Sequence, residues 1–190
     1  MMIFLDVETQ NDWTGGATFS VKDLKISYMG VIDENGKEYD FWEKDMEKSR
    51  ALLESASMIV GYNIFGFDMP VIANYLNGDV MNLPQLDLMV PAFKAIGFRP
   101  KLDSLTTATF GESKIGSGAD AVRYYASGDF DSLKKYCMED VRLTKKLYEF
   151  GRDKGYIKYY DKSGFIKEVK IDWKLGEKLP PEESGMLSMF

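Results

Sequence analysis

Two carboxylates, Asp6 and Glu8, stand two residues apart in the apolar run MMIFLDVET at residues 1–9. Such a run predicts a buried strand, and alternate side chains of a strand point to the same face. The two carboxylates then lie about 7 Å apart and repel each other unless a cation sits between them. Carboxylate oxygens are ligands that Mg²⁺ and Mn²⁺ prefer. The pair indicates a divalent metal site, and a solvated face of an edge strand is the alternative.

A third carboxylate, Asp68, lies in the segment GYNIFGFDMP at residues 61–70. This segment follows an expected strand at 58–62 and precedes an expected helix at 70–77, which starts at Pro70 because proline is favoured in the first helical turn. Asp68 therefore sits at a strand-to-helix junction, where a plain helix N-cap is the alternative interpretation. Asn63 likewise has the alternative of a polar turn residue.

The fourth carboxylate, Asp140, lies in the clearest helical pattern of the chain, at residues 129–150. Tyr136 and Asp140 are one turn apart and share a stripe with apolar residues spaced three and four apart. A carboxylate on a mostly apolar stripe is costly unless it is paired or bound to a metal. This position favours a functional role over surface solvation. The apolar members of the stripe are Leu133, Cys137, Val141, Leu147 and Tyr148.

The composition narrows the chemistry that the 190 residues can perform. The chain has no histidine and one cysteine, Cys137, which excludes a Ser-His-Asp triad, a Cys-His pair and, in effect, zinc sites. Catalysis must then depend on carboxylates, Tyr, Lys, Ser, Thr or metal-activated water. The net charge of −6 argues against a broad basic nucleic-acid surface but leaves room for a local groove.

Length and patterning predict one domain without a membrane span or a signal peptide. The lone cysteine cannot form an internal disulfide, which fits a reducing cytoplasm. Expected strands at 1–9, 24–32 and 38–42 form consecutive antiparallel pairs, and those at 58–62 and 83–88 follow as parallel strands. The fold class is therefore α/β, a mixed sheet flanked by helices. Helices are expected at 44–57, 70–77, 90–96, 104–110, 119–127 and 129–150.

The C-terminal part has a different pattern. Residues 156–173 predict a β-hairpin with its turn at 161–164, and residues 174–190 lack periodicity and predict an extended or disordered tail. The expected organisation is a domain at 1–155, a hairpin extension at 156–173 and a tail at 174–190.

Three segments in order resemble the motifs of a known nuclease superfamily. FLDVET resembles the first exonuclease motif of the DEDD superfamily, the DnaQ-like, ribonuclease H-like 3′→5′ exonucleases. GYNIFGFDMP is similar to the second motif, N-x-x-x-F-D, of proofreading domains in family B DNA polymerases, and YCMED resembles the third motif, Y-x-x-x-D. The tyrosine places the resemblance in the DEDDy branch, and residues 124–150 look most like the small stand-alone or helicase-associated YprB-like nucleases. The resemblance covers about residues 1–150.

The resemblance implies a ribonuclease H-like fold and a metal-dependent 3′→5′ exonuclease of single-stranded nucleic acid. Asp6, Glu8 and Asp140 are implied to hold one Mg²⁺ or Mn²⁺ ion, and Asp6 also bridges to a second ion held by Asp68. Two such ions clamp the attacking and leaving oxygens of an in-line displacement. Tyr136 is implied to orient the attacking water, because a phenol of pKa near 10 is a poor base at neutral pH.

Three further residues are implied to contact substrate. The backbone N–H of Thr9 would meet the 3′ end, Asn63 would hydrogen-bond the terminal nucleotide, and Phe67 would pack behind Asp68. Trp13 in the early loop would wedge against a terminal base, with a packed loop anchor as the alternative. Weaker candidates for phosphate contacts, which are otherwise ordinary solvated charges, are Lys94, Arg99, Lys101, Lys114 and Arg123.

Three functional hypotheses follow. The first is an active exonuclease, free-standing or serving a polymerase, a helicase or another replication or repair protein, because no polymerase region follows in the sequence. The second is a non-catalytic nucleic-acid or partner-binding module, which would be expected to lose some of the carboxylates. The third is a structure-specific endonuclease on the same fold. DNA is favoured as substrate and RNA is possible, since nothing in the sequence identifies a sensor of the 2′-hydroxyl.

Overall fold

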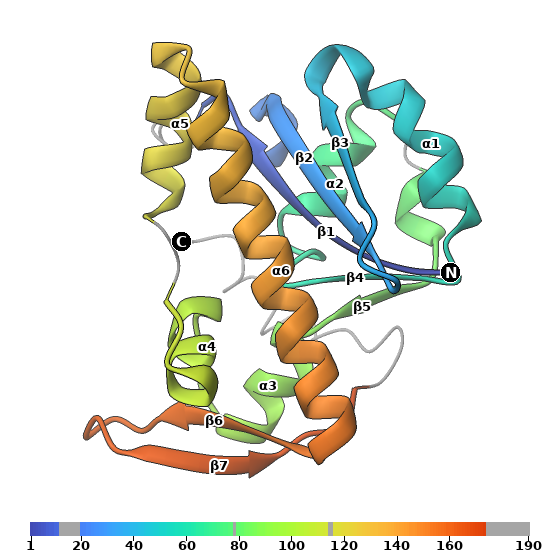
Figure 1. The fold of residues 1–190 in the computed structure, drawn as a ribbon. Coiled ribbons are helices and arrows are strands. Elements are labelled where there is room, and N and C mark those ends of the chain that lie inside the picture. Colours follow the sequence, from blue (N-terminus) through green and yellow to red (C-terminus); the bar gives the residue numbers. More distant parts are fainter. Residues whose placement is uncertain (12–19, 78, 114–115, 174–190) are drawn as a thin grey trace.

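A five-stranded mixed sheet forms the centre of the protein in the computed structural model, which describes residues 1–11, 20–77, 79–113 and 116–173 (Figure 1). The strand order is β3-β2-β1-β4-β5. β1 pairs antiparallel with β2 and parallel with β4, β2 pairs antiparallel with β3, and β4 pairs parallel with β5. This arrangement confirms the predicted α/β fold class. The strands are β1 Met2–Thr9, β2 Ile26–Asp33, β3 Glu38–Trp42, β4 Met58–Gly61 and β5 Gln85–Asp87.

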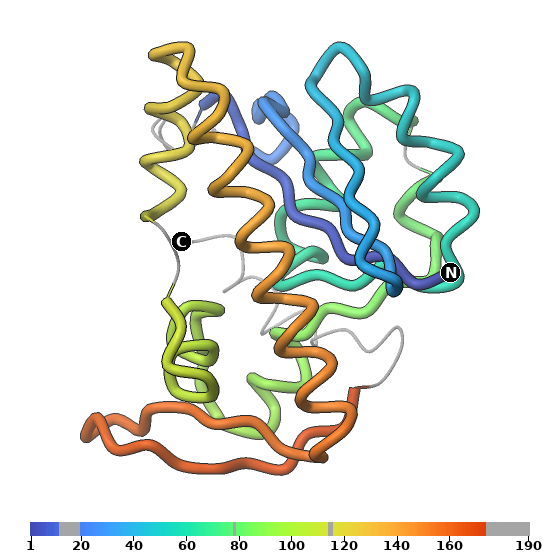
Figure 2. Tube along the Cα trace, viewed as in Figure 1, coloured from blue at the N-terminus to red at the C-terminus, as the bar shows by residue number. Residues whose placement is uncertain are grey.

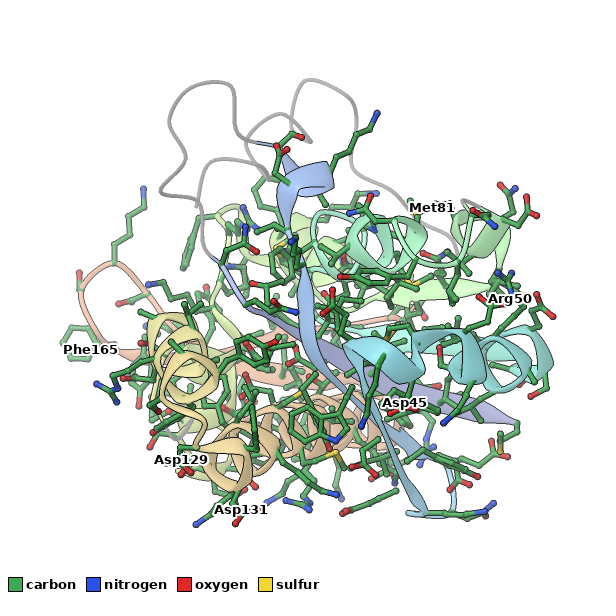
Figure 3. The ribbon with its side chains drawn as sticks, turned by 90° about the horizontal axis from the view of Figure 1, so that it is seen from above. Asp45, Arg50, Met81, Asp129, Asp131 and Phe165 are labelled. Carbon is green, nitrogen blue, oxygen red and sulfur yellow. The ribbon has the colours of Figure 1, made fainter. Side chains whose placement is uncertain are left out.

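Helices cover both faces of the sheet. The long α6 crosses one face with α5 and α4 beside it, whereas α1 and α2 pack on the other face (Figure 1). Figure 3 shows the two layers from above, with Asp129 and Asp131 of the α6 end on the opposite side of β1 from Met81. The α-helices are α1 Met46–Ser55, α2 Asp68–Ala73, α3 Met89–Ile96, α4 Leu102–Phe110, α5 Gly118–Ser127 and α6 Phe130–Lys154. Short 3₁₀ turns lie at η2 Val21–Asp23, η3 Glu43–Asp45 and η4 Asp79–Asn82.

Two helices begin two residues earlier than the sequence pattern predicts. α2 starts at Asp68, with Phe67 as its N-cap, so the alternative of Asp68 as a plain N-cap is wrong. α4 starts at Leu102 after the N-cap Lys101, and not at Ser104. In both cases tertiary burial outweighs local capping preference, because Asp68 and Leu102 are themselves buried.

A two-stranded antiparallel sheet, β6 Tyr156–Tyr160 and β7 Ile166–Lys170, follows α6 and passes under α4 in the view of Figure 2. The hydroxyl of Thr109 in α4 accepts from the backbone N–H of Lys158 (3.2 Å). After β7, the indole Nε1 of Trp173 donates to the backbone oxygen of Tyr148 (2.9 Å). The hairpin is thus anchored to α4 and α6. The predicted tail at 174–190 and Trp13 lie outside the described residues, and the division at residue 155 stays a prediction.

Register and pleat decide which way the first two carboxylates point. Phe4 packs in the hydrophobic cluster under α6, whereas its neighbour Leu5 packs in the cluster on the other face. Asp6 and Glu8 follow Phe4 at steps of two and therefore face α6. Across the ladder they pair with Gly30 and Tyr28 of β2.

Gly30 lets α6 come close to this face of the sheet. A Cβ placed on Gly30 would lie 2.7 Å from the Met138 sulfur, and 3.3 Å from both the Cys137 sulfur and a Val141 methyl carbon. Real Cβ atoms do not approach neighbours at the shortest of these distances, so only glycine allows the observed packing. The close approach sets the distance between α6 and the carboxylates of β1.

Among the described residues, no helix combines the length and the apolar character that crossing a membrane requires.

Substituting Gly30 with alanine is expected to destabilise the protein by about 1–3 kcal/mol, because the added methyl overpacks the interface with α6. Urea unfolding followed by circular dichroism measures the change. The matched control is Gly118→Ala, since a Cβ at Gly118 meets nothing within 4 Å. The double variant Gly30→Ala with Met138→Ala should lose less free energy of unfolding than the sum of the two single variants, by about 1 kcal/mol. Strict additivity would show that the sulfur contact does not cause the loss.

Candidate active site

A cavity of about 440 Å³ opens between β1, the turn after β4, α5 and the middle of α6. All four carboxylates singled out in the sequence line it, together with the tyrosine and the three predicted substrate contacts. Gly118, Ala119 and Val122 of α5 complete the wall. The eight predicted residues in this cavity are Asp6, Glu8, Thr9, Asn63, Phe67, Asp68, Tyr136 and Asp140.

The cavity has an acidic floor at β1. One ligand atom each from Asp6, Glu8 and Cys137 lie within 4.8 Å of one another. The Cys137 thiol donates to the Asp6 carboxylate oxygen Oδ2 (3.5 Å) and approaches the Asp6 backbone oxygen (3.4 Å). Burial, followed by the charges of Asp6 and Glu8, raises the pKa of the Cys137 thiol well above its usual range. The thiol therefore stays protonated and acts as a hydrogen-bond donor to Asp6.

Sequence reasoning placed Cys137 on the apolar stripe and missed this contact. The signal was its position, three residues before Asp140 and directly after Tyr136, which puts all three on the same side of α6. In the structure Tyr136 and Asp140 are 3% and 2% exposed, respectively, so α6 delivers both to the cavity from a buried position.

Asp68 reaches the cavity from the first turn of α2. Its Oδ1 accepts the backbone N–H of Val7 (2.9 Å), the residue between Asp6 and Glu8. This bond ties the start of α2 to β1 and brings the third carboxylate to the other two. Burial, and secondarily the charge of Asp6, raise the pKa of the Asp68 carboxyl well above its ordinary value. The arrangement thus confines negative charges that repel each other.

The turn between β4 and α2 is held by a carboxylate, Asp87, which the sequence analysis placed only within the expected strand at 83–88. Asp87 Oδ1 accepts the backbone N–H groups of Asn63 (2.7 Å) and Met89 (3.0 Å), and its Oδ2 accepts that of Phe65 (3.1 Å). These bonds fix Asn63 in the left-handed region, with φ at +66°. Burial raises the pKa of Asp87 to about 6, against the opposing effect of the three N–H donors.

The Asn63 side chain is therefore held against the cavity by a backbone conformation that asparagine tolerates better than most residues. Its Oδ1 atom is buried and has no hydrogen-bond partner within the described ranges. A buried carbonyl oxygen without a partner is costly, and a ligand that donates to it would remove the cost. No local pattern in the sequence signals the contacts of Asp87 with Asn63 and Phe65, because each joins residues more than twenty positions apart.

The donor set fits a hard divalent cation. Four carboxylates offer only oxygen, and the neighbouring thiol keeps its proton and so is not a thiolate ligand. Mg²⁺ or Mn²⁺ would also neutralise the repulsion among the buried acids. Asp6, Glu8, Asp68 and Asp140 are the residues that would hold such ions.

A second cavity of about 810 Å³ adjoins the first and shares part of its wall, including Asp6, Asn63 and Tyr136. Arg99 and Lys101, two of the predicted phosphate contacts, line it. The other candidates differ. Arg123 forms an ion pair with Asp120 (2.8 Å), Lys94 lines neither cavity, and Lys114 lies outside the described residues.

Comparison with known proteins supports the fold that carries this site. A family model described as the RNase H superfamily matches residues 3–150. The structure of the family B DNA polymerase from the hyperthermophilic archaeon Pyrobaculum calidifontis matches with a TM-score of 0.61 and 17% sequence identity, over 78% of this chain and 24% of that one. The chain thus spans about a quarter of the polymerase's length, and the likeness is one of fold. A search of curated proteins finds no match.

The metal-free protein is expected to become more stable as the pH falls from 8 to 5. The pKa values of Asp68 and Asp87 are raised in the folded state, so at these pH values the folded protein binds protons that the unfolded chain does not. The free energy of unfolding therefore rises as the pH drops through the folded pKa. Asp87 alone, with a pKa of about 6, accounts for about 1 kcal/mol over this range.

Urea unfolding in EDTA at several pH values measures this gain. Asp68→Asn and Asp87→Asn should each flatten the pH dependence, and the exposed control Asp79→Asn should not. Mg²⁺ should raise the midpoint more at pH 8 than at pH 5. A stability that is constant from pH 8 to 5 would contradict the assignment of buried, strained acids.

Proposed function

Because the chain belongs to the RNase H superfamily, we propose that it is a metal-dependent 3′→5′ exonuclease acting on single-stranded ends of nucleic acid. The observation that carries the proposal is that four carboxylates from β1, α2 and α6 share one cavity with Tyr136. A purely structural role would not gather three buried acids and the half-buried Asp6 in one place, because each buried acid costs free energy there.

Asp6, Glu8 and Asp140 would hold one ion, and Asp6 and Asp68 the other. Bound divalent ions supply an activated water and neutralise the charge on the phosphodiester. The chain's own residues position the reactants. The Tyr136 hydroxyl orients the attacking water, and the Thr9 backbone N–H meets the 3′-terminal sugar.

Asn63 and Phe67 hold the terminal nucleotide. The unpartnered Asn63 Oδ1 supports this role, since it offers an acceptor to a donor on the sugar or base. Phe67 lines the same cavity and forms the apolar wall beside Asp68. The volume of about 440 Å³ lies in the range of small-ligand sites, which suits one terminal nucleotide.

The adjoining cavity supports a single strand as substrate. Arg99 and Lys101 line it, and their positive charges would attract the phosphate of the terminal nucleotide. We favour DNA, with RNA as an alternative. The lone cysteine suits a reducing compartment such as the cytoplasm. The match to about a quarter of a family B DNA polymerase supports a partner of the polymerase type, and a helicase is the alternative.

Two other functions are weaker. A non-catalytic binding module does not need four carboxylates in one cavity, and all four are present. A structure-specific endonuclease would use the same acids, and cleavage of a circular single strand separates it from an exonuclease.

Digestion of 5′-labelled single-stranded DNA and RNA, with Mg²⁺, Mn²⁺ or EDTA, tests the proposal. The expected result is a metal-dependent ladder that shortens from the 3′ end. Asp6→Ala and Asp140→Ala should abolish it while leaving the fold intact, since each removes a ligand. Glu139→Ala, next to Asp140 but lining neither cavity, is the matched control and should stay active. Full activity in both Asp variants would rule out the metal assignment.

Tyr136→Phe should lower kcat by about 10- to 100-fold and leave KM nearly unchanged, because the hydroxyl positions water and does not bind the strand. Single-turnover kinetics on a labelled oligonucleotide measures this split. Tyr156→Phe on β6, outside both cavities, should behave like the unmodified protein. Equal rates for Tyr136→Phe and the parent would remove the tyrosine from the mechanism.

A further inference from the structure

A third cavity, of about 340 Å³, lies where β3 ends and α6 begins. We refer to it as the aromatic cavity. The rings of Trp42 and Phe130 meet edge to face, with centroids 5.3 Å apart, and those of Tyr125 and Phe130 are 6.0 Å apart. Phe130 is 47% exposed, so its ring is open to a ligand. The full lining is Ser27, Trp42, Glu43, Lys44, Tyr125 and Phe130.

The wall of the aromatic cavity contains a polar group that lacks a partner. Ser27 is 1% exposed, and its Oγ makes no hydrogen bond in the part of the chain that the structure describes. A buried hydroxyl without a partner is unfavourable, so its retention points to a ligand with a polar edge. The Glu43 carboxylate is already engaged, since it accepts from Gln10 Nε2 (2.6 Å) and from the Tyr75 hydroxyl (2.8 Å).

The aromatic cavity lies next to the catalytic cavity on the same side of the sheet. Val122 of α5 lines the catalytic cavity and Tyr125, one turn further, lines the aromatic one. On the sheet, Glu8 pairs with Tyr28, whose ring packs against Trp42 with centroids 4.9 Å apart. A strand that ends in the catalytic cavity therefore needs to continue only a short way along α5 to reach the aromatic cavity.

We propose that the aromatic cavity binds an unpaired nucleobase of the strand whose 3′ end occupies the catalytic cavity. The inference rests on the proposed exonuclease function and adds a second contact to it. A nucleobase has a flat face for Phe130 and Trp42 and a polar edge for the Ser27 hydroxyl. Lys44, exposed on the rim, suits the phosphate attached to that base. Stacking of this kind is tolerant of sequence, as an exonuclease that removes successive nucleotides of different sequence requires.

Binding of oligothymidylates in EDTA tests the proposal without cleavage. Phe130→Ala should weaken the binding of an octanucleotide by roughly fivefold or more, the usual loss for one stacked base. It should leave binding of a dinucleotide unchanged, because that ligand is too short to reach. Phe165→Ala is the matched control, since Phe165 is 65% exposed at the tip of the β6–β7 hairpin, pointing outward in Figure 3. Equal affinities for Phe130→Ala and Phe165→Ala would overturn the proposal.

Ser27→Ala separates binding from folding. It removes a buried hydroxyl without a partner, so the thermal midpoint should stay the same or rise. The affinity for the octanucleotide should nevertheless fall, because the base loses its polar contact. A lower thermal midpoint together with unchanged affinity would show that the hydroxyl serves the fold and not a ligand.

Hydrolysis of the p-nitrophenyl ester of thymidine 5′-monophosphate reports the catalytic cavity alone. Phe130→Ala should keep the parent kcat on this ester and raise KM only on long oligonucleotides. If the parent protein degrades oligonucleotides and Phe130→Ala does so with the same KM, the proposal of a nucleobase site is wrong, whereas the exonuclease proposal is retained. A protein side chain would then be the better candidate for the cavity. If the parent protein neither binds nor cuts any strand, the exonuclease proposal itself fails.

Discussion

The close approach of α6 to the sheet at Gly30 is the constraint on which the rest of the site depends. The register places Gly30 beside Asp6, and the missing side chain lets Cys137 and Met138 fill that space. A larger residue there would have to displace the Met138 sulfur or shift α6, and a shift of α6 would move Asp140 relative to the acids of β1. A feature of backbone packing thus sets the geometry of a charged site.

The site holds its acids together in buried positions, and this burial lowers the stability of the metal-free protein. Asp68 is tied to the Val7 N–H, and the Cys137 thiol donates to Asp6, yet both Asp68 and Cys137 have raised pKa values because burial disfavours their charged forms. The protein stores repulsion that a divalent cation would relieve. The same arrangement that weakens the metal-free fold makes cation binding favourable, which is the usual compromise of a preorganised site.

Much of this could be predicted from sequence because it follows from short-range periodicity. The step of two put Asp6 and Glu8 on one face, and the step of four put Tyr136 and Asp140 on one stripe; the structure places all four in one cavity. The antiparallel pairing of the first three strands and the parallel placement of the next two followed from turn signals and the parallel rule. What could not be predicted depends on contacts between distant segments. The bonds from Asp87 to the turn after β4 leave no local signature. The position of Cys137 directly after Tyr136 indicates the side of α6 on which it lies but not its contact with Asp6, and the early start of α2 follows from burial.

The end of α6 carries a consequence for the modularity of the chain. The indole of Trp173 occupies the space above Gly151, where a Cβ would lie 2.6 Å from the ring, and Ile157 of β6 is buried in the same cluster as Leu147. A cut after α6 would strip an apolar face from the helix that carries Tyr136 and Asp140. The shortest fragment that keeps this packing therefore ends at residue 173. A shorter fragment or fusion protein that contains only the motifs would expose an apolar, aggregation-prone surface.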